Sequence, residues 1–508
     1  MAVPTGAATA PSPRPPRKRG GRRRTLLPVV AALAVLGPLG WMWQASLLPD
    51  SYSVMDMGYR DEGRNQGSGA VPAQGHEGHH GPAARSVATL TEPSTAPADV
   101  RVDLTARKEP FRLASGQMVE GYTLNGSSPG PVITAEQGQL VEVRLVNESV
   151  PDGVTLHWHG VDVPNAVDGV AGVTQDAVPV GGEHVYRFRA DQRGSYWYHS
   201  HQVSHEQVQR GLLGALVVTP PGGLPGTTVD ELALVHIYDG VRTVNGRPGE
   251  TRVDAAPGTR VRVRVVNTDN GPMPVWVSGA AFRVVAVDGT DVREPGEVRD
   301  LSVEVTGGAR ADLEVEVPAG QAARVELGGA ALLLGQGDPP RSVRPTGKLD
   351  MLTYGTPAAL GFDPSAADRS FEYVIGRAPG FLDGWPGLWW TVNGHMYPDV
   401  PMFVVADGDV VRMRVENRSG ESHPMHLHGH HAVVLARDGV PATGSPWWVD
   451  SLEVGDGESY DIAFVADNPG IWMDHCHNLP HAAEGLVAHL MYEGVTVPYR
   501  VGGVNEPE

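Results

Sequence analysis

The sequence predicts an all-β protein of three homologous domains that follow an N-terminal apolar segment and a linker. The 508 residues include 64 glycines and 43 prolines, a composition typical of short strands joined by tight turns. An alternating apolar pattern that ends in Asn occurs three times, at 141–147, 261–267 and 411–417. Each copy indicates one β domain. We expect domains at 99–225, 226–350 and 351–508.

The N-terminus combines a basic stretch with an apolar one. Residues 1–25 hold seven Arg or Lys and no acidic residue, which predicts a basic cytoplasmic tail. Residues 26–45 predict a transmembrane anchor or an export signal, because an uncharged helix from Leu26 to Trp43 would span about 27 Å. Arg23-Arg24 also fits a twin-arginine export signal. A cleavage site after Ala45 is poorly supported, since Trp43 stands where small residues are usual. We favour an uncleaved anchor with the domains outside the cell membrane, and secretion if the segment is cleaved.

A flexible linker is expected at 46–98, because the segment is rich in Gly, Pro, Ala and Ser and most of it lacks apolar periodicity. Its Met and His side chains could bind copper transiently, or they could be incidental in a polar tether: Met55, Met57, His76, His79 and His80. Beyond residue 25 the chain has 33 basic and 59 acidic residues, a net charge of −26. This charge argues against a nucleic-acid partner and suits cations or neutral aromatic molecules.

Histidine pairs occur in the first and third copies of the repeat and are missing from the middle copy. The segments His157-Trp-His159 and His426-Leu-His428 follow the repeated strands of the outer copies, where the middle copy has Pro274-Val-Trp276-Val-Ser278. If histidine merely suited this scaffold, the middle copy should contain it too. The pairs therefore indicate a function.

A second landmark gives the same contrast. Gly194 is followed by His199 and His201, and Gly470 by His475 and His477, at the same offsets. Gly320 of the middle copy is followed there by Val325 and Leu327. Residues i and i+2 of a strand share one face, so the four pairs present eight imidazoles, which suit Zn, Cu, Fe or Ni.

Cys476 is the only cysteine, so it cannot form a disulfide within the chain. It lies between His475 and His477, and on an extended strand its sulfur faces away from both imidazoles. The thiolate is therefore expected to serve a different metal, with His423 and His481 as companions. One Cys and two His form the blue-copper ligand set.

Together these motifs resemble the four signature motifs of the multicopper oxidases, in the family's order and spacing, over about residues 100–498. They are His157-Trp-His159-Gly160, Trp197-Tyr198-His199-Ser200-His201, His423-Pro-Met-His426-Leu-His428-Gly429 and His475-Cys476-His477 with His481. The three-domain, laccase-like branch is the most similar in length. The resemblance implies three consecutive cupredoxin-like Greek-key β-sandwich domains, with no copper ligands in the second and the type 1 copper in the third.

The resemblance also implies four copper ions and their ligands. His423, Cys476 and His481 would bind the type 1 copper, and His157 with His426 the type 2 copper. One type 3 copper would be held by His159, His199 and His477, and the other by His201, His428 and His475. Leu486 occupies the axial type 1 position, where it cannot coordinate and should raise the reduction potential.

Reduction of oxygen to water needs protons, so an acid near the cluster is expected. Asp168 matches a family acid with this catalytic role, although Asp-Gly is also ordinary turn chemistry. The family's second acid has no counterpart, because Asn478, Leu479 and Pro480 occupy those places. Asp474 and Glu484 are weak candidates for it.

The expected function is a copper-dependent oxidase that couples one-electron oxidation of phenols or aromatic amines, as in laccases, to four-electron reduction of O₂ to water. Electrons would enter at His481. A metal-ion oxidase for Cu⁺, Fe²⁺ or Mn²⁺ is the alternative, favoured by the acidic composition and the His/Met linker. The 13 methionines are scattered, which argues against a cuprous oxidase. A copper-binding or electron-transfer protein without catalysis would leave the eight paired histidines unexplained. A monomer suffices, because one chain supplies every ligand.

Overall fold

The computed structural model describes residues 1–2, 10, 12, 21–63, 84–226 and 228–508, and the side chains from residue 30 onward within α1. Most of the basic tail, and His76, His79 and His80, lie outside the described residues. The chain divides into two compact units. One comprises Met1–Leu48 and Gly380–Gly387, and the other comprises Pro49–Pro379 and Leu388–Glu508.

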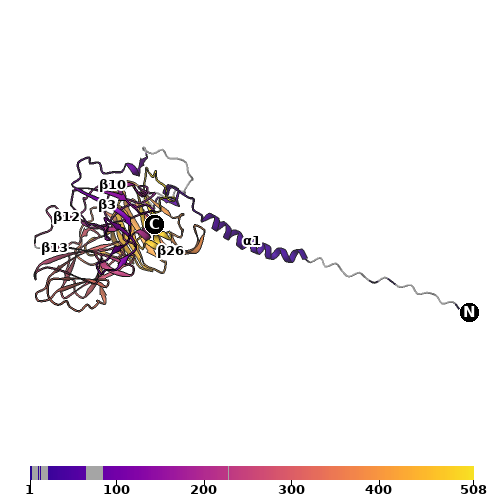
Figure 1. Cartoon of the computed structure of the whole chain (residues 1–508). Coiled ribbons are helices and arrows are strands. Elements are labelled where there is room, and N and C mark those ends of the chain that lie inside the picture. The colour runs from indigo at the N-terminus through magenta and orange to yellow at the C-terminus, as the bar shows by residue number, and fades with distance from the viewer. Residues whose placement is uncertain (3–9, 11, 13–20, 64–83, 227) are drawn as a thin grey trace. The chain divides into compact units, whose positions relative to one another are not determined.

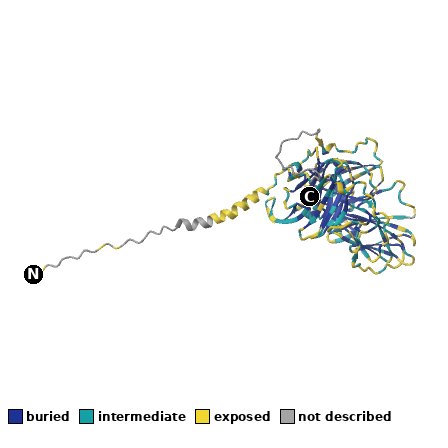
Figure 2. Ribbon diagram, turned by 180° about the vertical axis from the view of Figure 1, so that it is seen from behind, coloured by how far each residue is buried: buried dark blue, intermediate teal, exposed yellow. Residues whose placement is uncertain are grey.

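The smaller unit contains helix α1 (Gly21–Ala45), which is labelled in Figure 1. Its described side chains from Val30 to Ala45 are exposed (Figure 2). The loop after α1 bonds to the tip of a hairpin in the same unit. Asp383 donates its backbone N–H to the Ser46 carbonyl at 3.1 Å, and the Leu48 N–H donates to the Asp383 carboxylate at 3.2 Å. None of the described helices combines the length and apolarity that crossing a bilayer requires.

The larger unit is built almost entirely of strands, as the sequence predicts. Its first repeat has one sheet of β10 (Glu183–Arg189), β8 (Leu140–Asn147), β3 (Val100–Lys108) and β6 (Tyr122–Leu124). Its second sheet has β7 (Ile133–Glu136), β12 (Leu213–Thr219), β11 (Gly194–His199) and β9 (His157–His159). The short elements are η3 (Asn165–Val167), α2 (Ser204–Gln207) and the pair β4 (Phe111–Arg112) and β5 (Met118–Val119).

The middle repeat also has two sheets. The first runs in the order β15 (Arg247–Pro248), β14 (Val241–Val244), β13 (Thr228–Tyr238), β17 (Arg260–Asn267), β22 (Arg310–Glu316), β19 (Phe282–Val287) and β20 (Thr290–Asp291). The second runs in the order β16 (Glu250–Val253), β24 (Ala330–Leu334), β23 (Ala323–Leu327), β18 (Met273–Ser278), β21 (Leu301–Val305) and β25 (Gly347–Lys348).

The third repeat has the same plan. One sheet contains β27 (Trp385–Val392), β26 (Arg369–Leu382), β29 (Val410–Asn417), β35 (Ser459–Val465), β31 (Ala432–Arg437) and β32 (Val440–Pro441), with β33 (Trp447–Val449) on β31. The other contains β1 (Tyr59–Asp61), β28 (Pro401–Val405), β37 (Val487–Tyr492), β36 (Ile471–Cys476), β30 (His423–Leu427) and β34 (Ser451–Val454). Helices η4 (Pro364–Ala366) and α3 (Leu479–Ala483) complete it.

The pairing confirms that the three copies share one topology. The repeated strand pairs in parallel with an earlier strand and antiparallel with a later one in every copy: β8 with β3 and β10, β17 with β13 and β22, and β29 with β26 and β35. Each repeat encloses its own apolar core, and Figure 2 shows buried residues along the strands. Val325 and Leu327 lie in the middle core, fully buried. The domain boundaries stay a prediction.

The segment expected to be a linker is ordered in the parts that the structure describes. Tyr59–Asp61 forms β1, which pairs in parallel with β28, and η1 (Val54–Asp56) precedes it. Near residue 85, β2 (Arg85–Ser86) pairs with β38 (Val495–Thr496), and η2 (Val87–Thr89) follows. Val54, Met57 and Val87 are buried in the third core, and this burial offsets the loss of chain entropy. Met57, one of the possible transient copper ligands, is thus part of the third core.

Candidate metal centre

Four strands carry the histidine pairs to one place between the first and third repeats. In the first repeat, β11 pairs antiparallel with β9 and places His199 opposite His157. In the third, β36 pairs with β30 and places His475 opposite His426. The second histidine of the first pair, His159, lies within β9, where strand geometry turns it to the same side as His157. In the other three pairs the second histidine lies one or two residues past the end of its strand: His201, His428 and His477.

All eight paired histidines are buried, each at most 1% exposed. The structure brings their candidate ligand atoms within 4.8 Å of one another in three groups, of which the first two share His159. The groups are His157, His159 and His426; His159, His199 and His477; and His201, His428 and His475. These gather the residues that the resemblance assigns to the type 2 and type 3 copper ions, and their role as ligands stays a prediction.

The hydrogen bonds of these rings leave nitrogens free on the cluster side. Buried nitrogens without a hydrogen-bond partner include Nδ1 of His159, Nε2 of His199, Nε2 of His201 and both nitrogens of His477. Buried polar atoms are normally satisfied, so this concentration of unpartnered atoms fits bound metal. Burial, together with the neighbouring His157, lowers the pKa of His201 and of His477 to about 3 each, which keeps both rings neutral with lone pairs available.

The opposite ring nitrogens are fixed by backbone carbonyls. Nδ1 of His157 donates to the Asp168 carbonyl at 2.9 Å, and Nδ1 of His426 donates to the Asp450 carbonyl at 2.9 Å. Nδ1 of His199 donates to the Ser200 carbonyl at 3.0 Å. Such bonds set the tautomer and orientation of a metal ligand. The Nε2 atoms of His157 and His426 consequently face each other at 3.4 Å. The donor set and its orientation fit copper.

Asp168 lies against two predicted ligands. It follows η3 and is 1% exposed, and its carboxylate oxygens lie 3.1 and 3.3 Å from Nδ1 of His428. One of them is also 3.1 Å from Nδ1 of His157. Gly169 continues the turn at a φ of +80°, where a Cβ would meet the Leu156 carbonyl oxygen at 1.8 Å. The carboxylate therefore orients His428, and its predicted role in proton delivery stays a prediction.

Cys476 and its two expected companions form a separate group. Its sulfur lies 3.6 Å from Nδ1 of His423 and 3.9 Å from Nδ1 of His481, and these two nitrogens are 3.2 Å apart. Burial, with the neighbouring His481, lowers the pKa of His423 to about 3. Leu486 is fully buried in the same core. The group has the composition of a type 1 copper site.

One buried aromatic ring and three charged side chains lie around His481. The Trp390 ring lies 4.5 Å from the His481 ring between centroids, and Arg377 lies 4.2 Å above Trp390. The Trp390 indole donates to the Glu484 carboxylate at 2.9 Å, and a Glu421 carboxylate oxygen lies 3.6 Å from Nε2 of His481. The His481 side chain is 13% exposed, so one edge of it reaches solvent.

Neither weak candidate for the second acid lies at the histidine cluster. Glu484 bonds to Trp390 on the type 1 side. Asp474 shares the strand face of Cys476 and points away from His475 and His477.

Three residues at or next to the cluster could not be identified from the sequence. Asp450 lies 3.1 Å from Nε2 of His159, and Arg310 of the middle repeat binds Asp450. Glu508 lies 3.1 Å from Nδ1 of His475, and burial raises the pKa of its carboxyl to about 8. No motif marks these three residues, which come from distant segments.

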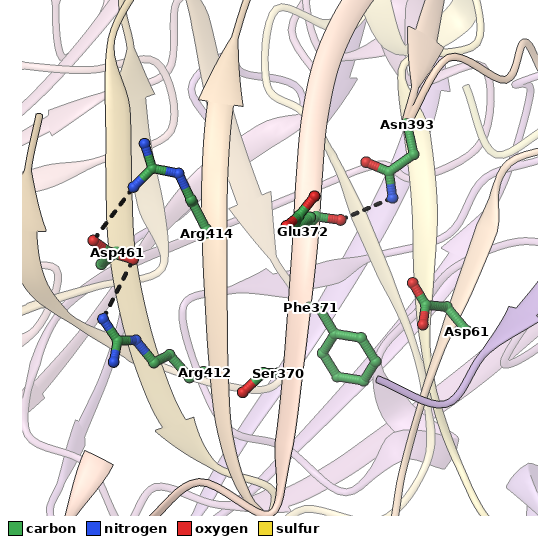
Figure 3. A pocket seen from close by; sticks show the side chains of 8 residues that line it. All are labelled: Asp61, Ser370, Phe371, Glu372, Asn393, Arg412, Arg414 and Asp461. Carbon is green, nitrogen blue, oxygen red and sulfur yellow. Dashed lines mark hydrogen bonds and ion pairs between the residues drawn. The ribbon is translucent and has the colours of Figure 1, made fainter. Parts of the chain in front are cut away.

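A cavity of about 360 Å³ lies elsewhere, on the solvent face of the sheet that contains β26, β29 and β35 (Figure 3). Asp461 lies between Arg412 and Arg414, at 3.5 and 3.6 Å, and Asn393 donates to the Glu372 carbonyl at 2.8 Å. Because these charged and polar groups bond to one another, the cavity gives no indication of a ligand.

Comparison with known proteins agrees with this geometry. Two multicopper oxidase family models match, over residues 105–223 and 377–494. Laccase-1 of Botryotinia fuckeliana is 27% identical over 73% of this chain and 78% of its own length. The multicopper oxidase MmcO of Mycobacterium tuberculosis is 28% identical over 77% of this chain and 87% of its own length. The iron transport multicopper oxidase fetC of Epichloe festucae is 26% identical over 72% of this chain and 72% of its own length. The crystal structure of a multicopper oxidase from Pseudomonas thermotolerans matches with a TM-score of 0.63 at 27% identity, over 77% of this chain and 98% of that chain.

The cupredoxin-like repeats, the buried histidine pairs and these matches define a copper-dependent oxidase that uses oxygen as its electron acceptor. The chain belongs to the multicopper oxidase family, and within it to the laccase-like proteins.

Proposed function

We propose that this chain is a laccase-type oxidase that holds four copper ions, one of type 1, one of type 2 and a type 3 pair. The observation that carries the proposal is the arrangement on β36. Cys476 joins the group of His423 and His481 on one face of the strand, and its two neighbours join the eight-histidine cluster on the other. When bound, copper supplies one-electron oxidation at the first site and four-electron reduction of O₂ at the second.

The protein side chains have distinct roles in this proposal. The single strand links the two groups through a few covalent bonds, from Cys476 to His475 and His477. Asp168 and the backbone carbonyls hold the imidazoles in fixed orientations. Burial lowers the pKa of His201 and of His477, which keeps these two rings neutral, and it excludes bulk water from the eight-histidine cluster. The exposed edge of His481 is the point at which an external donor comes nearest to the type 1 group.

Phenols and aromatic amines are the proposed electron donors. The exposed edge of His481 can take one electron from such a molecule without a fitted pocket, and the laccase among the relatives is similar over 73% of this chain. A metal-ion oxidase is the second candidate, favoured by Glu421 and Glu484 near the type 1 group and by the iron transport relative.

Oxygen uptake by the copper-loaded full chain with a phenol, Cu⁺, Fe²⁺ and Mn²⁺, compared side by side, tests the proposal. We expect the highest kcat/KM with the phenol. Turnover with metal ions alone would favour the second candidate, and no turnover with any donor would refute the assignment of donors altogether.

We also propose that the protein is exported and anchored in the cell membrane by its N-terminal segment, with the β repeats outside, or secreted if that segment is cleaved. The exposed apolar side chains of α1 and the basic residues before them support this. A monomer is proposed because one chain supplies every candidate ligand. Membrane fractionation of cells expressing the full chain, followed by sedimentation of the detergent-solubilised protein, tests both points.

A further inference from the structure

Asp450 contacts two predicted ligands at once. Its carboxylate oxygen Oδ1 lies 3.1 Å from Nε2 of His159, and its backbone carbonyl accepts the Nδ1–H of His426 at 2.9 Å. Ser451 Oγ also lies 3.1 Å from Nε2 of His159. With Nε2 turned toward these groups, His159 presents its unpartnered Nδ1 to the cluster. The orientation of the Asp450 carboxylate therefore bears on which nitrogen His159 offers to a metal.

The partner that fixes this carboxylate comes from the middle repeat. Arg310, at the start of β22, donates from Nη1 to Oδ1 of Asp450 at 2.6 Å and from Nε to the Ser195 carbonyl at 2.9 Å. Its side chain is fully buried, as is that of Asp450. One guanidinium thus joins a residue of the first repeat to one of the third.

The chain next to His159 is shaped around this guanidinium. Gly160 has a φ of +81°, and a Cβ there would lie 2.1 Å from Nη2 of Arg310. Since real Cβ atoms do not approach so closely, the turn after β9 depends on glycine when Arg310 is in place.

Asp288 of the middle repeat fixes the backbone on both sides of the ion pair. Its Oδ1 accepts the Arg310 N–H at 2.8 Å, and its Oδ2 accepts the N–H groups of Asp450 and Ser451 at 3.2 and 3.3 Å. Asp450 itself lies between two positive groups, Arg310 and His431. Nη1 of Arg310 donates to its Oδ1, and Nε2 of His431 lies 3.3 Å from its Oδ2. Burial lowers the pKa of His431, but Asp162 and Asp450 outweigh it and raise the pKa well above its usual value.

We propose that Arg310 and Asp288 make the middle repeat a positioning element of the metal centre, although that repeat contains no copper ligand. They hold Asp450 so that His159 keeps Nε2 outward and Nδ1 toward the cluster. Arginine suits this role because its planar fork reaches two acceptors in fixed geometry, which a single ammonium cannot do. The inference rests on the copper assignment proposed above.

Copper titration of the apoprotein of the Arg310→Lys variant tests this role. Arg264→Lys is the matched control, because Arg264 is also a buried arginine of the middle repeat, bonds to Ser195 at 3.0 Å and pairs with Asp312 at 3.1 Å. The trinuclear cluster is the proposed type 2 copper together with the type 3 pair. Because Arg310 acts through Asp450, the outer partner of His159, Arg310→Lys should lower the copper affinity of this cluster by up to the roughly 10- to 100-fold that loss of such a partner causes. The near-ultraviolet absorption of the type 3 pair should fall with it, while the visible type 1 absorption stays.

Arg264→Lys should change neither signal, whatever its effect on thermal stability. Equal trinuclear affinities in the two variants would overturn the proposal. If Arg310→Lys does not fold, the double variant Arg310→Met/Asp450→Asn removes one charge of each sign and leaves neither partner charged alone. It should fold and show the same loss of trinuclear affinity, and wild-type affinity in it would refute the positioning role. A wild-type chain without either absorption would instead refute the copper assignment.

Discussion

Cys476 and His475 are neighbours on β36, yet they belong to different groups of candidate ligands. The Cys476 sulfur lies 3.6 Å from Nδ1 of His423, whereas Nε2 of His475 lies 3.2 Å from Nε2 of His428 on the other face of the strand. Strand alternation alone produces this separation. In the proposed enzyme, it gives a short covalent connection between the type 1 group and the eight-histidine cluster.

Replacing Cys476 by serine separates the two groups functionally. Serine keeps the strand and its volume but provides no thiolate for copper. We expect Cys476→Ser to lose the visible type 1 absorption and the oxidation of external donors, while the type 3 absorption and the copper of the trinuclear cluster remain. Loss of all copper would show that the two groups do not form independently.

Leu486→Met tests the axial position of the type 1 group. Leucine is fully buried there and cannot coordinate, whereas a methionine sulfur could approach the metal as a weak axial ligand. The swap nearly conserves volume and should cost less than about 1.5 kcal/mol of stability. Redox titration of the visible band should show a lower type 1 potential. An unchanged or higher potential would exclude Leu486 as the axial residue.

Asp168→Asn separates orientation from proton delivery. The asparagine carbonyl oxygen can still accept the Nδ1–H of His428, so the visible and near-ultraviolet absorptions should remain. Without the acid, reoxidation of the reduced enzyme by O₂ should slow by about 100-fold or more, the usual contribution of a general acid. Stopped-flow mixing with O₂ measures this rate. Normal reoxidation would leave Asp168 as a positioning residue only.

Gly308→Ala tests the close contact between Gly308 of the middle repeat and the histidine cluster. A Cβ on Gly308 would lie 2.8 Å from Cε1 of His159 and 3.0 Å from Cγ of His477. Gly320→Ala is a matched control, because its φ of +78° is close to the +83° of Gly308 but nothing lies within 4 Å of its Cβ position. Both should lose about 1 kcal/mol from backbone strain. Weaker type 3 absorption is expected in Gly308→Ala alone, and equal spectra would contradict the contact.

His489 should make the fold sensitive to acid. Burial lowers its pKa from 6.5 to about 4, and neither of its nitrogens has a partner. Between these two pH values the unfolded chain binds a proton that the folded chain does not, so stability falls as the pH drops through this range. The loss is about 3 kcal/mol. Urea unfolding of the wild-type chain and of His489→Leu at pH 6.5 and at pH 4.5 measures this loss, which should be absent from His489→Leu. If the stability of the two proteins falls equally between these pH values, His489 is not its cause.

Strand periodicity explains how much the sequence could predict. The alternating segments correspond to β8, β17 and β29, and the paired histidines lie together because residues i and i+2 share a face. The comparison with the middle copy separates them from scaffold residues, since Val325 and Leu327 fill the equivalent places with core.

Contacts between repeats could not be predicted in this way. Arg310, Asp288 and Asp450 come from segments far apart in the sequence, and each alone has the appearance of an ordinary polar residue. The strand Tyr59–Asp61 is too short for a periodic signal and forms because β28 offers a free edge and the third core accepts Met57. Such features depend on tertiary packing.

The most direct test of the account is an anaerobic titration of the copper-loaded full chain with a phenol, followed by addition of O₂. The proposed four-copper enzyme takes up four electrons per molecule, loses both its visible and near-ultraviolet absorptions, and recovers them with consumption of one O₂ and no release of hydrogen peroxide. Uptake of a single electron, or stoichiometric peroxide after reoxidation, would contradict it.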